Sequence, residues 1–212
     1  DVKDQLERVN QWAHEAVEIW YPESEHRRAH FGQTLSVAWN QEPLAVDAII
    51  ELLETPETPA IARAAALTWL DPSHSTDSAD TAIANLQSSN PQVRIAALMT
   101  MQGYRDNTPG LSPFTTLVKK AMPLLEDELR SVRVTAVQVV SEIPQNLWKG
   151  QHKSAFRRAL DELKLGLLVN NDRAATHLSL GSIYENLGDA NLAEQYYRLA
   201  IQVEPHATGP RA

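Results

Sequence analysis

Three short segments of the sequence resemble one another, and their recurrence limits the possible folds more than any other feature does. Each has an arginine, an alanine three residues later and a large apolar residue seven residues later. The copies read PAIARAAALTWL, PQVRIAALMTM and RSVRVTAVQVV, and their arginines are Arg63, Arg94 and Arg133. The spacings between these arginines are 31 and 39 residues. An apolar helical stretch precedes each copy, so the repeating unit is a pair of helices. Helix pairs that recur every 30–40 residues or so are typical of an α-solenoid.

The residues of each copy have predictable roles in such an array. The alanines, Ala66, Ala97 and Ala136, are small enough to let neighbouring helices approach closely. We expect each arginine to reach an acidic side chain or a carbonyl of an adjacent repeat. Thr58-Pro59 and Asn90-Pro91 predict an N-cap followed by proline at the first helical position. The turn-rich stretches 71–80 and 106–113 are predicted to connect the repeats. The pattern resembles HEAT repeats.

The segment LGSIYENLGDANLAEQYYRLAIQVEP, from Leu180, occurs only once in full. Counted from Ala174, its small, aromatic and proline positions resemble the tetratricopeptide repeat (TPR) consensus, except that His177 stands where tryptophan is usual. The resemblance implies two antiparallel helices that cross at Gly181 and Ala193. The helix predicted over 151–169 aligns with the second half of a preceding TPR-like unit, and we expect the full repeat to pack against it.

These observations predict an all-α fold: an α-solenoid of HEAT-like helix pairs followed by TPR-like helices. The chain divides into a helical pair at 1–42, HEAT-like repeats at 43–145, and a half repeat plus one full TPR at 146–212. In the first part, apolar spacing predicts helices over 2–20 and about 24–39.

Charge and composition exclude several classes of function. The formal net charge is −8, and residues 1–58 hold 12 acids and 4 bases, whereas residues 59–212 hold 15 of each. A nucleic-acid-binding protein would need a basic face, so nucleic acid is not expected as a partner. The 212 residues include no cysteine, which excludes disulfides and thiolate sites in this stretch. No apolar run is long enough for a membrane span.

No catalytic, cofactor-binding or metal-binding constellation is predicted. His26 and His30 have a spacing that can hold a metal, but no third ligand is evident and two arginines lie between them. The serine-rich stretch 73–78 is predicted to be a polar linker, and the acids at 126–128 a solvated face or a helix cap. The five tryptophans are spaced as core residues are. A metal-dependent enzyme that uses the histidines remains a weaker alternative.

The predicted partner-binding surface is the face of the first TPR helix. In peptide-binding TPRs this face carries repeat positions 2, 5, 9, 12 and 13, and here these positions are Ala175, Leu178, Ser182, Glu185 and Asn186. TPRs that clamp a terminal carboxylate use lysine and asparagine at positions 5 and 9, so Leu178 and Ser182 disfavour that mode. A solvated face without a partner is the alternative.

The order of segments resembles one bacterial family. QWAHEAVEIWY, HFGQTLSVAWNQEP, the HEAT-like helices and the TPR follow one another as in the C-terminal part of multihaem c-type cytochromes. The resemblance implies an extracytoplasmic, periplasmic location and haem-attachment motifs upstream of Trp12, a stretch that holds no cysteine here. The predicted function is therefore a non-enzymatic scaffold that binds a protein partner or its own N-terminal haem domain. The alternative is the structural half of an electron-transfer oxidoreductase. No cofactor is expected in this stretch itself, although haem c is implied for a longer chain.

Overall fold

The computed structural model describes residues 8–13, 15–16, 19, 31–40, 45–107, 109–110 and 112–205. Within these residues the regular structure is entirely helical and contains no strand. The elements are α2 (Phe31–Trp39), α3 (Ala45–Glu54), α4 (Ala60–Leu67), α5 (Thr76–Asn85), α6 (Pro91–Thr100), α7 (Thr115–Lys120), η2 (Met122–Glu126), α8 (Arg130–Ser141), η3 (Gln145–Leu147), α9 (Gly150–Leu167), η4 (Leu168–Asn170), α10 (Ala174–Asn186) and α11 (Ala190–Val203). The predicted all-α solenoid is confirmed.

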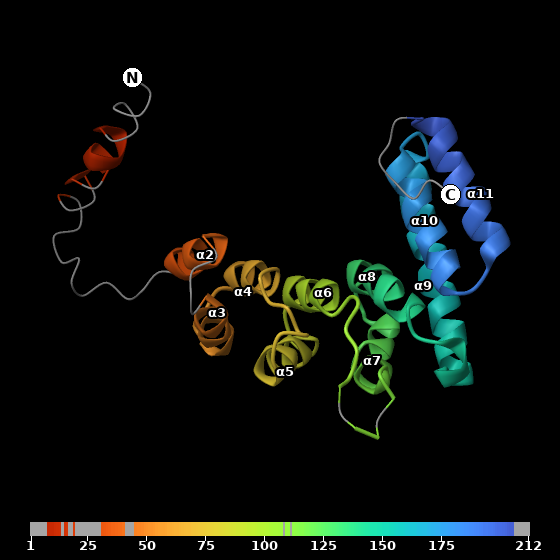
Figure 1. Cartoon of the computed structure of the whole chain (residues 1–212), viewed down its shortest axis with the longest axis horizontal. Coiled ribbons are helices and arrows are strands. Elements are labelled where there is room, and N and C mark those ends of the chain that lie inside the picture. Colours follow the sequence, from red (N-terminus) through yellow and green to blue (C-terminus); the bar gives the residue numbers. More distant parts are fainter. Residues whose placement is uncertain are drawn as a thin grey trace.

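The helices of the repeat array form two layers. Helices α2, α4, α6 and α8 follow one another along one layer, and α3, α5 and α7 form the other (Figure 1). Each of the three predicted pairs, α3–α4, α5–α6 and α7–α8, is in contact. A continuous apolar core runs along the array and beyond it, from Ala38 to Ile183 in α10. The alanines that recur three residues after each arginine, Ala66, Ala97 and Ala136, are fully buried, as predicted.

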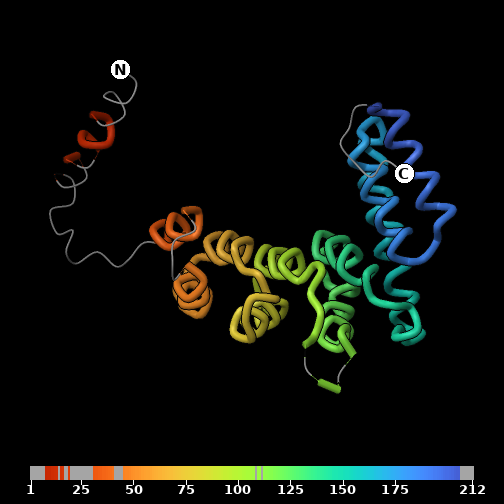
Figure 2. Tube along the Cα trace, viewed as in Figure 1, coloured from red at the N-terminus to blue at the C-terminus, as the bar shows by residue number. Residues whose placement is uncertain are grey.

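The chain changes direction after the array. Helices α4 and α6 are seen closer to end-on in Figure 2, whereas α9, α10 and α11 are seen from the side. Helix α9 packs on α8 and η2, and α10 pairs with α11 while its end contacts α8. The C-terminal helices therefore form an arm that leaves the array at α9.

Of the two N-caps predicted from the sequence, one is present and the other is not. Asn90 caps α6, and Pro91 is its first residue, because the Asn90 side chain accepts a hydrogen bond from the Gln92 amide at 2.9 Å. Thr58, in contrast, does not cap α4, since its hydroxyl donates to the Leu52 carbonyl at 2.9 Å and so closes the end of α3. Ser75 caps α5 by accepting from the Ser78 amide at 3.1 Å.

Two predicted boundaries are therefore wrong. The connection predicted over 71–80 ends at Ser75, because a capping serine starts a helix inside that polar stretch. The apolar helical stretch predicted before the third copy, RSVRVTAVQVV, is divided into α7 and the 3₁₀ turn η2, which contains Pro123. A proline inside a helix removes a backbone donor and clashes with the preceding turn, which accounts for the division.

The recurring arginines join successive repeats, as predicted. Arg94 pairs with Asp127 of the next repeat, with Nη2 at 2.9 Å from Oδ1 and Nε at 2.9 Å from Oδ2, and both side chains are about nine-tenths buried. Arg133 makes a two-pronged contact with Glu162 of α9 at 2.8 to 3.1 Å. Both arginines also donate to carbonyls of the turn before their own helix.

The first arginine of the series has a different partner. Arg63 donates from Nη2 to the amide oxygen of Asn85 at 3.1 Å, and its Nε has no hydrogen-bond partner in the described part of the chain. The joint between the first two repeats therefore has no ion pair at this position among the described residues.

Two sequence predictions concern parts that the structure describes incompletely. Residues 8–13, 15–16 and 19 are helical, in agreement with the first predicted helix, while His26, His30 and residues 24–30 lie outside the described residues. The three-part division at residues 1–42, 43–145 and 146–212 stays a prediction.

Candidate interaction surface

The C-terminal hairpin is held together by a close crossing of α10 and α11. At Gly181, fully buried in α10, an added Cβ would lie only 2.5 Å from Cε1 of Tyr197 on α11. Ala193 and Ala200 of α11 are also buried. Any side chain larger than hydrogen at position 181 would collide with the tyrosine ring, so glycine is required by the distance between the helices rather than by backbone conformation.

An aromatic stack fills the space beside this crossing. The rings of Tyr184 and Tyr196 are stacked with centroids 5.5 Å apart and planes 4° from parallel, and His177 stacks on Tyr196 at 6.3 Å. Nε2 of His177 lies 2.8 Å from the Asn171 carbonyl, so it carries the proton of that hydrogen bond. Histidine thus occupies the usual tryptophan position as a buried aromatic ring that also holds the preceding turn.

Two adjacent residues, Gly188 and Asp189, determine the turn between α10 and α11. Gly188 has φ of 77°, a conformation that glycine adopts without steric cost. The next residue, Asp189, caps α11 by accepting a hydrogen bond from the Leu192 amide at 3.1 Å. The Gly-Asp pair therefore ends one helix and starts the next, which fixes the hairpin geometry.

The hairpin packs against two earlier helices. The Thr176 hydroxyl lies 3.3 Å from the carbonyl of Leu167, the last residue of α9, and Ile183 belongs to the core that includes residues of α9. This confirms the predicted contact with the helix at 151–169. Contact with the end of α8 was not predicted: Asn186 donates to the Ser141 hydroxyl at 3.2 Å, and Gln145 donates to the Leu187 carbonyl at 3.0 Å.

The five predicted partner-binding residues all lie on α10, and four of them are exposed. These four are Ala175, Ser182, Glu185 and Asn186, while Leu178 is half-buried. Three of the exposed residues also have structural contacts. Asn186 donates to Ser141 at the end of α8, and Glu185 accepts a hydrogen bond from the Tyr197 hydroxyl at 2.5 Å. Ser182 also interacts with the Tyr197 side chain. Partner binding by the five residues stays a prediction.

The Glu185–Tyr197 contact has an electrostatic consequence. Partial burial, followed by the hydrogen bond to Glu185 and the charge of Glu185, raises the pKa of Tyr197 to about 12. The phenol therefore remains a hydrogen-bond donor throughout the physiological pH range. It holds one carboxylate oxygen on the exposed face of α10.

No metal-binding group emerges from the described residues. Among them, no group of three or more histidine, aspartate or glutamate side chains is arranged to hold a metal ion. In the serine-rich stretch, Ser75 is a helix cap and Ser73 donates to Asp71. No helix in the described ranges combines the length and apolar character that crossing a membrane requires.

The acids at 126–128 were predicted to be a solvated face or a helix cap, and this holds for most of them. Glu126 and Glu128 are exposed, whereas the Asp127 side chain is buried against Arg94 and accepts a hydrogen bond from the Leu129 amide just before α8. The interpretation of the tryptophans as core residues is wrong for three of them. Of the tryptophans predicted as core, only Trp148 is buried among the described ones, while Trp12, Trp39 and Trp69 are exposed. Helical spacing identifies the face on which a tryptophan lies, but it does not show whether another helix covers that face.

Comparison with known proteins agrees with the geometry of the hairpin. The tetratricopeptide repeat family model matches residues 174–206, which are the residues of α10, the Gly-Asp turn and α11. No curated protein and no solved structure matches the chain. The C-terminal arm thus carries a TPR repeat, a unit that mediates protein–protein interaction, at the end of an all-helical solenoid.

Proposed function

We propose that this chain is a non-enzymatic helical repeat scaffold that binds a protein partner through the exposed face of α10. One observation carries the proposal. In the TPR hairpin, Gly181, Tyr184 and Ala193 pack between the helices, whereas four of the five residues at partner-binding positions are exposed on one helix. Exposed side chains on this face are available to a partner.

The chemistry of this face indicates the kind of segment it would bind. It presents a small apolar residue, a hydroxyl and a carboxylate, Ala175, Ser182 and Glu185, and no cation. A carboxylate held by Tyr197 favours a partner that brings a hydrogen-bond donor or a basic side chain to it. Leu178, half-buried, offers an apolar contact nearby.

Site-specific photo-crosslinking in the native host tests this proposal. A photoreactive amino acid at Ser182 should give a discrete adduct with a single protein, and Glu185→Lys should abolish that adduct. The matched control is the same photoreactive residue at Gln151, which is exposed on α9 but lies on no proposed surface. Equal adducts from both positions, or none from Ser182, would contradict the proposal.

The finer proposal places this scaffold in a larger multihaem c-type cytochrome protein of the periplasm, where it would pack beside a haem domain. Its support is the order of the segments around Trp12 and His30 followed by HEAT-like and TPR helices. The matched TPR model supports only the repeat, and the haem context rests on the sequence resemblance alone.

The alternative is that this chain is the structural half of an electron-transfer oxidoreductase. In that case haem-attachment motifs would lie upstream of Asp1, whereas a pure scaffold needs none. Reading the gene upstream for Cys-x-x-Cys-His motifs separates the two, and an absorption spectrum of the full-length product checks for haem c. Absence of both the motifs and the haem bands would remove the cytochrome context and leave the scaffold proposal intact.

A further inference from the structure

Exposed large apolar side chains in the repeat array gather on one layer. Trp39 is 73% exposed, Ile61 65%, Trp69 40% and Met99 58%, and all four belong to α2, α4 or α6 or follow them directly. In the other layer, the described residues of α3, α5 and α7 include no exposed large apolar side chain. Single exposed apolar residues are ordinary, but their confinement to one layer marks an interaction surface.

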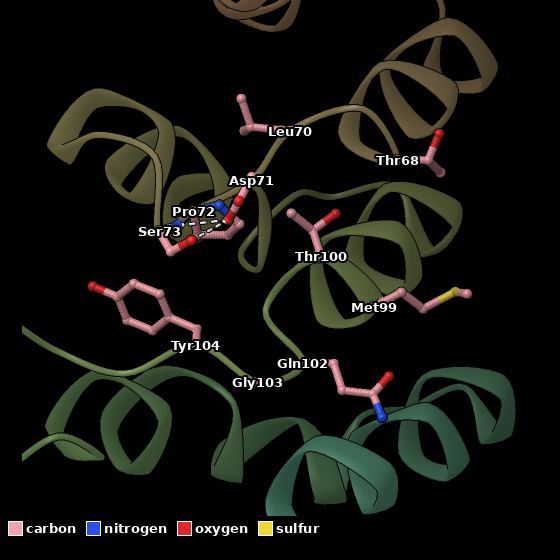
Figure 3. A pocket seen from close by; sticks show the side chains of 10 residues that line it. All are labelled: Thr68, Leu70, Asp71, Pro72, Ser73, Met99, Thr100, Gln102, Gly103 and Tyr104. Atoms are coloured by element: carbon pink, nitrogen blue, oxygen red, sulfur yellow. Dashed lines mark hydrogen bonds between the residues drawn. The ribbon is translucent and has the colours of Figure 1, made fainter.

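A groove of about 480 Å³ opens on this layer between the ends of α4 and α6. Figure 3 shows Thr68 at the end of α4, Met99 on α6, and Asp71 in the loop that leads from α4 to α5. Thr68 and Met99 occupy equivalent repeat positions, each five residues after its recurring arginine. Trp69, which follows Thr68, meets Trp39 edge to face with ring centroids 5.8 Å apart. The groove is thus lined by the exposed Met99 and lies near an exposed aromatic pair, Trp39 and Trp69, because Trp69 stands between the lining residues Thr68 and Leu70 in the chain.

The groove has a negative rim and lacks a cation. Asp71 lines it, and none of the described residues that line it is basic. Tyr104 also lines the groove, near Ser73 (Figure 3), and its phenol pKa is raised by burial and then by the nearby charges of Asp106 and Asp80. The C-terminal ends of α4 and α6, which carry partial negative charge, also meet here.

The closest arginine in sequence does not neutralise this rim. Arg105 pairs with Glu142 at 3.2 Å, and its guanidinium lies 4.6 Å above the Phe114 ring. Over residues 45–107 the chain carries eight acids and three bases, so the repeats that form the groove have a net negative charge. An acidic groove beside apolar side chains is complementary to a segment that is both basic and apolar.

The carboxylate of Asp71 is held in place and kept ionised. It accepts hydrogen bonds from the Ser73 amide at 2.8 Å and the Ser73 hydroxyl at 2.6 Å. These hydrogen bonds, with a smaller contribution from the charge of His74, lower the pKa of the Asp71 carboxyl. A fixed anion costs a ligand little ordering, which favours its use in recognition.

We infer that this groove docks a basic segment of a protein partner, which places a lysine or arginine beside Asp71 and an apolar side chain on Met99 and Trp69. The inference rests on the proposed scaffold function, but it concerns a second surface that is separate from α10. Because Asp71 and Met99 lie in the array, the scaffold would hold two segments, one on the array and one on the arm.

Selection of peptides on the purified chain tests the inference. The probe is a phage-displayed library of random peptides, and the selected sequences are resynthesised with a fluorescent label for anisotropy titration. Selected peptides should contain lysine or arginine next to a large apolar residue, and added salt should weaken their binding. Asp71→Asn, which keeps the side-chain shape, and Met99→Ser should each weaken binding by about three- to tenfold.

Matched controls make the result specific. Asp172→Asn removes the same charge from an exposed turn, and Leu165→Ser removes an exposed apolar side chain from α9; both should bind as the parent does. No selected peptides, peptides without basic residues, or equal binding by the Asp71 and Met99 variants would each overturn the inference.

Two further outcomes separate this inference from its alternatives. Peptides whose binding is lost with Glu185→Lys, but not with Asp71→Asn, would support the α10 surface and overturn the groove. Sedimentation of the chain alone tests a second copy as the occupant: we expect a monomer, and self-association that Met99→Ser abolishes would assign the groove to another copy of the chain and overturn the basic partner.

Discussion

The repeat array and the C-terminal hairpin are both built from antiparallel helix pairs, yet different contacts hold their units together. In the array, Arg94 and Arg133 reach forward to an acid of the next unit, so the ion pairs join one repeat to another. In the hairpin, Gly181 lies against Tyr197 and Tyr184 stacks on Tyr196, so the close contacts join two helices within one repeat.

This difference explains which repeats tolerate irregular spacing. A long arginine side chain can reach an acid that lies 29 or 33 positions later in the chain, as Arg133 and Arg94 do. A glycine–tyrosine contact has no such range, since an added Cβ at position 181 would already be 2.5 Å from the ring. The array can therefore be degenerate in sequence, while the hairpin must keep its small residues in register.

The largest effect is expected when the hairpin is separated from the array. The isolated segment 168–212 should be largely unfolded, because it loses the core around Ile183 and the hydrogen bonds that Asn186 and Gln145 make across the joint. One helical hairpin buries too little apolar surface to fold alone. Circular dichroism of the purified segment measures this, with the full chain as control. A cooperative thermal melt with strong helical signal would show that the repeat needs no neighbour.

The second largest effect is expected when an acid that joins two repeats is removed, and its size should differ between two joints of the array. Asp127→Ala should lower the free energy of unfolding by about 3–5 kcal/mol, because it leaves the Arg94 guanidinium buried without its counter-ion. Glu162→Ala should cost only about 1 kcal/mol, since the Arg133–Glu162 pair is exposed to 22% and 32% and is screened by water.

Urea denaturation followed by circular dichroism measures both variants. Equal losses would mean that burial does not distinguish the two joints. A loss for Glu162→Ala larger than that for Asp127→Ala would contradict the ranking altogether.

Within the hairpin, Gly181→Leu should cost about 1–3 kcal/mol through overpacking against Tyr197. The loss should be confined to α10 and α11, because the array has its own core and its own ion pairs. Hydrogen exchange with mass spectrometry, read for each helix, measures where protection falls. Gly150→Leu is the matched control, as an added Cβ there meets no atom within 4 Å. Unchanged protection in α10 would contradict the tight crossing.

Much of the fold follows from the sequence because its signals are periodic and local. The recurring arginines, the buried alanines three residues later and the Gly181–Ala193 crossing could all be predicted from spacing. The burial of Asp127 could not, since its partner Arg94 lies 33 residues away and only tertiary packing brings the two together.

The surfaces were harder to predict than the core. Trp39 and Trp69 have the spacing of core residues but are exposed. Helical periodicity shows on which face of its helix a side chain lies, but it does not show whether another helix covers that face. On α10 the consensus positions identify the candidate face, whereas the contacts of Asn186 with α8 and of Glu185 with Tyr197 depend on how the hairpin is placed. Contacts between two repeats do not recur at regular intervals in the sequence, so sequence periodicity does not predict them.

The smallest expected effect concerns the hydrogen bond between Tyr197 and Glu185, a polar contact between α10 and α11. Tyr197→Phe should cost about 1 kcal/mol or less at neutral pH, because the bond is partly exposed. The pKa of Tyr197 is raised from its usual 10.0 to about 12 in the folded chain, so the folded state holds this proton more tightly than the unfolded state does. Its contribution is therefore fully present below pH 10 and is lost as the pH rises toward 12.

The difference between parent and variant should consequently shrink to nothing as the solution approaches about pH 11 to 12, where tyrosinate would face the Glu185 carboxylate. Urea denaturation of both proteins at neutral and at alkaline pH measures this difference, and each pair shares every other titrating group, so the comparison isolates Tyr197. A gap of constant size across that range would show that the hydroxyl contributes nothing through Glu185. The crossing of α10 and α11 would then depend on Gly181 and the aromatic stack alone, in sharper contrast to the ion-paired joints of the array.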